Sequence, residues 1–563
     1  MFTQSKKKYL TFEPLKSLLI KPFMIQNKIF SSVGRYIFPV VIFILLSVSG
    51  SGQNNKQDLS GIRKYNALMQ MIKFAYVDTV NESKLVEKAI VETLKDLDPH
   101  SMYISKKDLQ RANEELVGNF EGIGVQFEIL RDTINIVHPI PGGPSERLGI
   151  LSGDKIIKIE SENVTGKKIT NQFVFDRLRG KKGTKVNVSI YRSGKKDLID
   201  FTIVRDKIPI NSIDASYIIE PGIGYINLTR FSSTSMKEFT DAMVKLNEQG
   251  MKSLILDLRN NGGGYMNTAV ELADQFLETK KLIVYTLGRM SPREDYYSTE
   301  KGMFEKGKLV IMINENSASA SEIVSGAIQD LDRGIIVGRR SFGKGLVQRP
   351  FQLPDSSEVR LTTARYYTPS GRCIQKPYSE GVDKYYEDFT TRLKHGEMEN
   401  SDSIKFPDSL KFHTSKGRIV YGGGGIMPDV FIPLDTTPFT DYFLNLRRKN
   451  VINLFVGDYV DKYRKDLQTK YPDFDAFDKK FIIDDAFIKD FLSLAEKEGV
   501  KMNEKEYGLS ETLIKSQIKS LIAQKLWDVN ASYKIINRED NEVQKAIGII
   551  KNNALFDKLG IQR

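Results

Sequence analysis

The chain has 563 residues, a formal net charge of +12 and a single cysteine, Cys373. Its length predicts three or four folded domains, each large enough to bury a core. One cysteine excludes an internal disulfide, and the four histidines lack the spacing of a metal-binding motif, so we expect no cofactor and no metal site.

Half of the net positive charge comes from residues 1–35, which contain seven basic residues and one acidic residue. The rest is spread along the chain without an aromatic and basic motif, so we expect no nucleic-acid partner. An apolar stretch, Ile37 to Val48, comes next, and small polar residues follow it. This layout predicts that residues 1–52 are a signal peptide or an uncleaved membrane anchor that contacts the membrane. Both interpretations place the rest of the protein in the periplasm or cell envelope, either free or anchored to the inner membrane.

Two regions with different periodicity follow the leader. Residues 53–120 repeat apolar side chains at helical spacing, for example at Leu68, Met71 and Ile72, which predicts an N-terminal helical region. From 121 to 208, apolar and polar residues alternate in short runs, and one amphipathic stretch interrupts them. This pattern predicts a small β-barrel with a helix beside an open sheet edge, where a peptide can add as a further strand.

Three segments of the barrel region resemble a PDZ domain of bacterial proteases: Gly122 to Val125, Pro144 to Ile156, and Leu178 to Thr184. The resemblance implies that the first segment binds the terminal carboxylate of a peptide through backbone N–H groups. In the alternative interpretation its glycines only form a tight turn. The predicted peptide-binding residues are Gly122, Ile123, Gly124 and Val125.

Strand and helix patterns alternate from 209 to 435, which predicts an α/β core. Within it, residues 375–416 are rich in charges and tyrosines and weakly periodic, so we expect an inserted loop there. From 436 to 563 the pattern is helical, which predicts a separate C-terminal helical region with Ile518 and Ile522 on its apolar face. The predicted fold class is multidomain α+β.

A strand that ends at Ile313 leads into Ser317-Ala318-Ser319-Ala320-Ser321 and then into a helix. Ser319 and Glu322 match a capping box, so helix capping is the plain interpretation of this serine. The segment also resembles the nucleophile segment of the carboxyl-terminal processing peptidases, or tail-specific proteases. That resemblance implies a ClpP/crotonase-like protease core in residues 209–435, with Ser319 as the nucleophile.

Lys344 lies 25 residues after Ser319, in a segment that resembles both a phosphate loop and the lysine segment of the tail-specific proteases. Gly345 stands where a phosphate loop needs a hydroxyl, and a strand pattern follows instead of a helix, which disfavours nucleotide binding. Strand alternation puts Lys344 and Gln348 on one face. The resemblance implies that Lys344 is the general base. This role requires burial to lower the pKa of its amine, which the uncharged Gln348 is suited to orient.

Two further groups belong to the predicted site. Asp330 is a candidate catalytic residue by family resemblance, but a carboxylate beside Lys344 would keep the amine protonated, which favours a structural role at a helix end. The glycine-rich loop after Arg259 also resembles a family segment, although strand-to-helix turns are often rich in glycine. The predicted oxyanion donors are Gly262, Gly263 and Ala320.

The resemblance to tail-specific proteases extends from Asp98 to about Pro433. It implies an ATP-independent serine endopeptidase that recognises the carboxyl-terminal tails of proteins through its PDZ domain. The alternative is a non-catalytic PDZ adaptor on a protease-like scaffold. The expected partners are protein or peptide substrates with free tails, and an envelope adaptor or a dimer partner for the C-terminal helices.

Overall fold

The computed structural model describes residues 60–300 and 302–561, and the chain divides into two compact units, Met1–Glu82 and Ser83–Arg563. The described part of the first unit holds helix α2 (Ser60–Ala75), none of whose side chains is buried. Among the described helices, none is both long and apolar enough to cross a lipid bilayer. The predicted leader lies outside the described residues.

The second unit begins with helix α3 (Glu82–Lys95), strand β1 (Met102–Ile104) and helix α4 (Lys106–Val117). Strand β1 pairs antiparallel with β18 (Glu358–Tyr367), a strand of the core. This pairing brings the turn just before β1, from Asp98 to Ser101, to the core.

The predicted PDZ domain contains a six-stranded antiparallel sheet, in which five strands follow the order β3-β4-β5-β7-β8 and β6 pairs with β5. Thr170 caps its main helix, α6, by accepting the N–H of Phe173. Alternate side chains of the strands point inward to one apolar core, as the period of two predicts. The elements are β3 (Val125–Leu130), β4 (Thr133–Pro139), α5 (Pro144–Arg147), β5 (Lys155–Ile159), β6 (Glu162–Asn163), α6 (Asn171–Leu178), β7 (Lys185–Tyr191) and β8 (Ile199–Val204), and the pair β2 (Asn119–Gly122) and β9 (Asp206–Pro209) flanks them.

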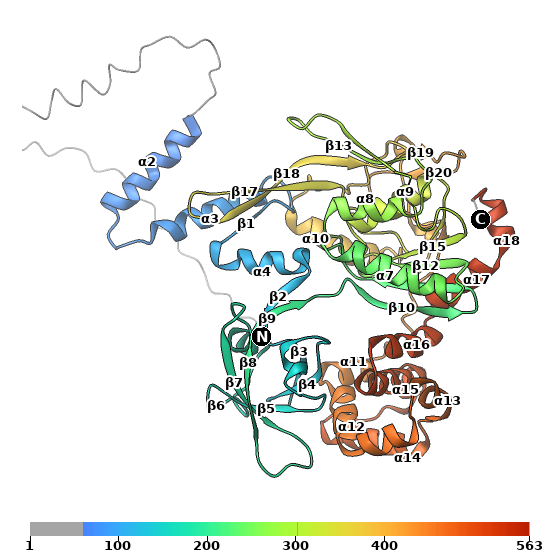
Figure 1. Cartoon of the computed structure of the whole chain (residues 1–563). Coiled ribbons are helices and arrows are strands. Elements are labelled where there is room, and N and C mark those ends of the chain that lie inside the picture. Colours follow the sequence, from blue (N-terminus) through green and yellow to red (C-terminus); the bar gives the residue numbers. More distant parts are fainter. Residues whose placement is uncertain (1–59, 301, 562–563) are drawn as a thin grey trace, which may run out of the picture. The chain divides into compact units, whose positions relative to one another are not determined.

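A six-stranded sheet forms the centre of the protease core, in the order β10-β11-β12-β15-β16-β21 (Figure 1). Only β10 is antiparallel to its neighbour; the other strands are parallel and read as continuous apolar runs because both faces of the sheet are covered. The strands are β10 (Ile213–Glu220), β11 (Ile223–Leu228), β12 (Ser253–Asp257), β15 (Lys308–Ile313), β16 (Ile335–Gly338) and β21 (Val430–Phe431).

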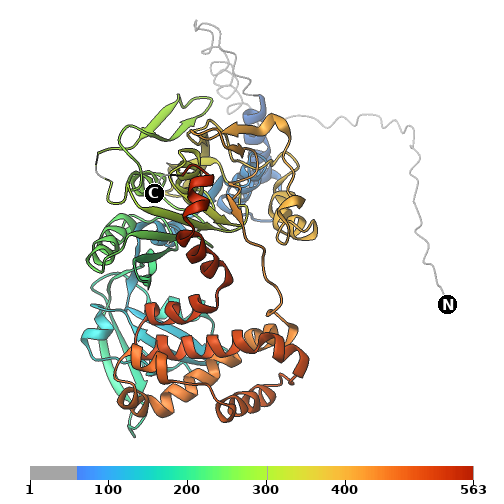
Figure 2. The ribbon, with the colours of Figure 1, turned by 90° about the vertical axis from the view of Figure 1, so that its right-hand side faces the viewer.

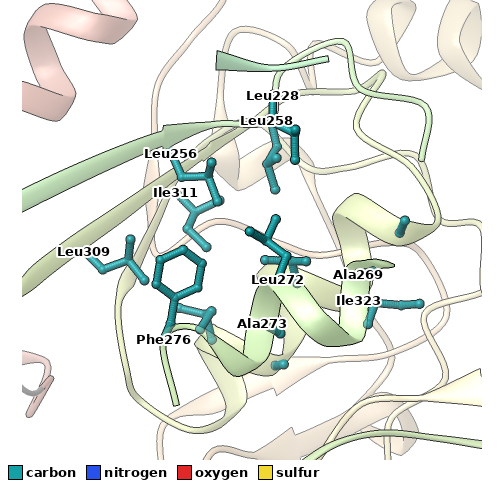
Figure 3. Packing of buried hydrophobic residues seen from close by; sticks show 14 of the residues in the cluster. Leu228, Leu256, Leu258, Ala269, Leu272, Ala273, Phe276, Leu309, Ile311 and Ile323 are labelled. Carbon is teal, nitrogen blue, oxygen red and sulfur yellow. The ribbon is translucent and has the colours of Figure 1, made fainter. Parts of the chain in front are cut away.

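Each face of this sheet packs against its own helices. On one face, helices α7 (Ser235–Glu248), α8 (Met266–Asp274) and α9 (Ala320–Asp330) bury side chains such as those of Leu256, Ile311 and Phe276 (Figure 3). The opposite face is covered by the last two helices of the chain, α17 (Asn541–Lys551) and α18 (Asn553–Lys558). The predicted C-terminal helical region is present, but its last two helices pack on the central sheet instead of forming part of a separate unit.

A second sheet of the core has the order β1-β18-β13-β14, with β17 (Leu346–Gln352) also paired to β18. Its other strands are β13 (Leu282–Leu287) and β14 (Glu294–Tyr297). The segment expected to be an irregular loop, 375–416, instead contains a helix, α10 (Val382–Lys394), whose Tyr385 is buried against the core. Short elements follow this helix: η1 (Ser401–Ser403), η2 (Asp408–Leu410), β19 (Lys411–His413) and β20 (Ile419–Tyr421).

The helices between the core strands and α17 lie together as a bundle (Figure 2). These six helices, α11 to α16, share their own core, which is rich in aromatic side chains. Ile518 and Ile522 are both fully buried in it, as the helical spacing predicts. The bundle binds the PDZ domain through three ion pairs, Arg131–Asp458, Lys155–Asp461 and Lys525–Glu128. The helices are α11 (Asp441–Arg448), α12 (Val451–Lys470), α13 (Phe474–Lys480), α14 (Asp485–Lys497), α15 (Glu504–Leu526) and α16 (Val529–Glu539).

Candidate active site

Ser319 stands between the end of β15 and the first turn of α9, at φ 56° and ψ −110°. A positive φ is uncommon for a residue other than glycine and is costly, so the surroundings must hold it in place. The serine is half-buried and lines a cleft of ≈ 700 Å³ that also contains Lys344 and Gln348. The sequence around this strand-to-helix turn lacks the Gly-x-Ser-x-Gly motif that would predict a strained serine. The strained geometry of Ser319 is therefore visible only in the tertiary structure.

The Glu322 side chain is fully buried and joins the serine segment to the lysine segment. Its carboxylate accepts the backbone N–H groups of Ser319 at 2.8 Å, Gly343 at 2.7 Å and Lys344 at 2.9 Å. It also accepts the hydroxyl of Ser341 at 2.5 Å. Burial raises the pKa of Glu322, and the four donors oppose that rise by stabilising the charged form. The capping interpretation is thus incomplete, because Glu322 binds the helix start and the lysine loop together.

Tyr366 of β18 makes a second connection between the same two segments. Its hydroxyl lies 3.1 Å from the carbonyl oxygen of Ser319 and 2.8 Å from that of Lys344, so these two acceptors share its single proton. Burial raises the pKa of Tyr366 well above its usual range, so the hydroxyl keeps its proton. The N–H groups and the carbonyl groups of Ser319 and Lys344 are therefore all held by buried side chains.

Lys344 is half-buried beside the start of β17. Burial lowers the pKa of its amine, and the positive charge of Arg360 acts in the same direction. The carboxylates of Glu322 and Asp98 partly oppose this shift. The direction is the one that a general base requires, because only the neutral amine can accept a proton.

Gln348 lies opposite Thr362, where a bulge shifts the register between β17 and β18. Its Nε2 donates to the Thr362 hydroxyl oxygen at 3.2 Å. Leu346 and Val347 line the cleft along with Lys344 and Gln348, so both faces of this strand contribute. Lys344 lies before the start of β17, and the register shift falls next to Gln348, so strand alternation does not explain why these two residues share the cleft.

The loop before α8 packs directly against the serine. A Cβ added to Gly263, whose φ is 101°, would come within 2.9 Å of the Ser319 Cβ and 3.0 Å of the Ala320 nitrogen, so this close approach requires glycine. The N–H of Gly263 donates to the side chain of Asn261 at 2.9 Å. Within the described part of the chain, the N–H groups of Gly262 and Ala320 have no hydrogen-bond acceptor.

Asp330 lies at the far end of α9. A rise of about 1.5 Å per residue separates it from Ser319 by roughly 15 Å. Its carboxylate forms a fully buried ion pair with Arg372 at 2.7 Å and accepts the N–H of Ser370 at 3.1 Å. Asp330 does not line the cleft, and these contacts make it a structural residue at a helix end.

The turn before β1 contributes residues that were not among the predicted site residues. Asp98 is buried and accepts four hydrogen bonds, one of them from the Thr362 hydroxyl at 3.1 Å. His100 contacts the Tyr385 hydroxyl at 2.8 Å, and burial together with the charge of Lys344 lowers its pKa to about 4. In the sequence, only the residue run Asp-Pro-His-Ser could have indicated that this turn belongs to the site.

The predicted peptide-binding loop of the PDZ domain borders a small pocket between β3 and α6. The carbonyl oxygen of Ile123 accepts the N–H and hydroxyl of Ser145, and that of Gly124 accepts the N–H of Ile140. The N–H groups of Ile123 and Gly124 have no acceptor among the described residues. Because β3 is an edge strand, it has a free side along which a peptide can pair.

Comparison with known proteins identifies the families that this chain resembles. The profile of Peptidase family S41 matches residues 222–387, that of the PDZ domain matches 122–203, and that of a family of unknown function matches 442–528. The chain is 34% identical over 357 residues to a carboxy-terminal-processing protease of Bartonella bacilliformis. The matched residues cover 62% of this chain and 81% of that protein.

Two further relatives have similar names. The carboxy-terminal processing protease CtpA of Bacillus subtilis is 36% identical over 314 residues, which cover 56% of this chain and 66% of the relative. Among solved structures, a photosystem II D1 C-terminal processing protease is 28% identical, with a TM-score of 0.32 over 55% of this chain and 83% of that protein. The chain belongs to the carboxy-terminal-processing proteases of Peptidase family S41, and it is a serine-type peptidase that carries a PDZ domain.

Proposed function

We propose that this peptidase is an ATP-independent endopeptidase that cleaves exported proteins near their carboxyl ends, with Ser319 as nucleophile and Lys344 as general base. The observation that carries the proposal is the binding of the Ser319 and Lys344 backbones by one buried carboxylate, that of Glu322. Both side chains line the same cleft, and burial lowers the pKa of the amine.

The reaction follows from these groups. The Ser319 oxygen attacks the carbonyl carbon of the substrate while its proton moves to the neutral amine of Lys344. The N–H groups of Gly262 and Ala320 stabilise the oxyanion; that of Gly263 would first have to leave Asn261. Lys344 then protonates the leaving amine of the substrate. In the second half of the reaction, a water attacks the acyl-enzyme and gives a proton to the Lys344 amine, which returns a proton to the Ser319 oxygen as the acyl–oxygen bond breaks.

The PDZ domain would select the substrate by its free carboxylate. Ile123 and Gly124, whose backbone N–H groups have no acceptor among the described residues, line the pocket together with apolar side chains such as Val125, Val174 and Leu178. This composition suits a tail that ends in an apolar residue. A relative's domain has been solved in a complex with peptide, the PDZ domain of a carboxy-terminal protease from Vibrio cholerae.

The leader supports an exported location. The basic segment and the short apolar stretch in residues 1–52 have the layout of an export signal, and the body of the protein would work in the periplasm or cell envelope. Cell fractionation checks this location, and a folded body found in the cytoplasm would refute it.

Substitution of the lysine tests the mechanism. Lys344→Arg keeps a positive charge, but a guanidinium stays protonated and cannot accept the serine proton, so turnover should fall by a factor of about 10²–10⁴. The control is Lys306→Arg, at an exposed lysine of the core, which should leave turnover unchanged. Cleavage of a tail-bearing protein by purified variants is the assay, and substantial proteolysis by Lys344→Arg would refute the proposal.

The pH dependence provides a second test. Because burial lowers the pKa of Lys344, the neutral amine forms at a lower pH than for a free lysine, and kcat/KM should rise with pH through that lowered value. A non-catalytic adaptor would instead bind tails without cutting them. In that case neither the wild type nor Ser319→Ala would cleave the substrate, although both would bind it.

A further inference from the structure

The turn before β1 makes a chain of hydrogen bonds that ends at Gln348. The Asp98 carboxylate accepts the N–H groups of His100 and Ser101, each at 2.8 Å, and the hydroxyl of Ser101 at 2.6 Å. It also accepts the hydroxyl of Thr362 at 3.1 Å. The same threonine oxygen lies 3.2 Å from Gln348 Nε2. The buried carboxylate is thus linked through one hydroxyl to a residue of the catalytic cleft.

The direction of each bond follows from what each group can donate. An ionised carboxylate only accepts, so the single proton of the Thr362 hydroxyl goes to Asp98. The threonine oxygen then has only lone pairs left for Gln348, and it must accept from the amide nitrogen. This arrangement fixes the orientation of the amide, because turning it over would place two acceptors, the Thr362 oxygen and the Gln348 Oε1, against each other.

The orientation matters for a lysine that acts as a base. With its Nε2 bound to Thr362, Gln348 has its carbonyl oxygen free of the threonine, and Lys344 lines the same cleft. In the reacting enzyme this oxygen would accept an N–H of the Lys344 amine. The lone pair of the neutral amine then remains free for the serine proton. A reversed amide would present N–H groups, which would bind that lone pair and block proton transfer.

We propose that Asp98 is a positioning residue which, through the Thr362 hydroxyl, keeps the carbonyl oxygen of Gln348 directed toward Lys344. The inference rests on the proposed Ser-Lys mechanism and adds the residue that positions its general base. The backbone reinforces the chain, because the Thr362 N–H donates to the Ser101 hydroxyl oxygen at 3.1 Å and β1 pairs with β18.

Two substitutions at one position separate positioning from packing. Thr362→Val keeps the shape of the side chain and the charge of Asp98 but removes the hydroxyl, so kcat should fall roughly tenfold with little change in KM, as expected for the loss of one ordering hydrogen bond. Thr362→Ser restores a hydroxyl and should recover most of kcat. An unchanged kcat in Thr362→Val, or a serine variant that is as slow as the valine variant, would overturn the proposal.

A double-mutant cycle tests whether the effect passes through Gln348. In a Gln348→Ala background there is no amide to orient, so Thr362→Val should cause no further loss of kcat. An equal tenfold loss in that background would overturn the proposal. The cycle is independent of the identity of the base: if Lys344→Arg kept its activity, the Ser-Lys mechanism would fail, whereas the coupling between Thr362 and Gln348 would still be measured.

Asp98→Asn distinguishes two effects of the Asp98 carboxylate: its charge, which acts on the pKa of Lys344, and its hydrogen bond, which sets the direction of the Thr362 hydroxyl. Loss of the carboxylate removes a charge that raises the pKa of Lys344, so the pH profile should move to lower pH, while the loss of amide ordering should lower the plateau of kcat. Thr362→Val should lower the plateau without that shift. Thermal unfolding of each variant shows whether it is folded, and a folded Asp98→Asn enzyme with the wild-type plateau would contradict the proposal.

Discussion

The catalytic cleft has a volume of ≈ 700 Å³ and the PDZ pocket one of ≈ 40 Å³, although both have two backbone N–H groups with no acceptor among the described residues. In the cleft, buried polar side chains hold the reacting segments: Glu322 binds their N–H groups and Tyr366 their carbonyl groups. The PDZ pocket is walled mainly by apolar side chains, and the rings of Phe127 and Phe175 meet edge to face across it, 5.7 Å apart.

This difference reflects two tasks. Stabilising a transition state requires donors and a base that are already in place, and buried hydrogen bonds provide that rigidity. Binding many different tails requires an apolar pocket whose rings can separate to admit a side chain. We therefore expect substitutions in the cleft to act mainly on kcat, and changes in the groove or in the tail to act mainly on KM.

The largest expected effect comes from Glu322→Gln. The variant keeps the size of the side chain but replaces one acceptor oxygen by an NH₂ group, which must then face donors from Ser319 and Lys344 or from Ser341 and Gly343. Burying donors against donors costs about 1–3 kcal/mol for each unsatisfied group, so kcat should fall at least about a hundredfold and the melting temperature should drop.

A matched control for this variant is Glu271→Gln, at an exposed position of α8. Steady-state kinetics and thermal unfolding of the two variants give the comparison. Wild-type kcat in Glu322→Gln would show that the buried carboxylate does not hold the two catalytic segments in place.

An intermediate effect is expected from the substrate side. A tail that ends in an amide lacks the negative charge that the N–H groups of Ile123 and Gly124 would bind, and a hydrogen bond to a charged group contributes about 1.5–3 kcal/mol. Amidation should therefore raise KM by about tenfold to a hundredfold and leave kcat nearly unchanged. Equal KM values for the acid and the amide would mean that this groove does not recognise the end of the chain.

The smallest effects concern the contact between the PDZ domain and the helical bundle. Arg131 and Asp458 form a half-exposed ion pair at 3.0 Å, and Arg131→Gln should change the free energy of unfolding by under about 1 kcal/mol. Lys525 and Glu128 are mostly buried and 2.7 Å apart, so Glu128→Gln should cost more. Melting temperatures of both variants, at low and high salt, test this order, and the reverse order would show that burial does not govern the contact.

The sequence by itself determined the local patterns of this protein. Alternation over 121–208 and the apolar runs at 223–228, 253–257 and 308–313 identify strands, because each period reports which side chains leave water. The resemblance to segments of the tail-specific proteases pointed to Ser319, Lys344 and Gln348, and the structure places all three in one cleft.

Only the tertiary structure decided what these elements meet. An apolar face does not specify its partner, so α17 and α18 were assigned to a separate region although they cover the sheet of the core. Helix α10 was missed although Tyr385, Phe389 and Leu393 recur at helical spacing in it, because the charged residues and tyrosines of the whole segment obscured this pattern, and the buried Tyr385 shows how the helix packs. The bond from Thr362 to Asp98 joins residues 264 positions apart, and no local pattern can encode a partner at that separation.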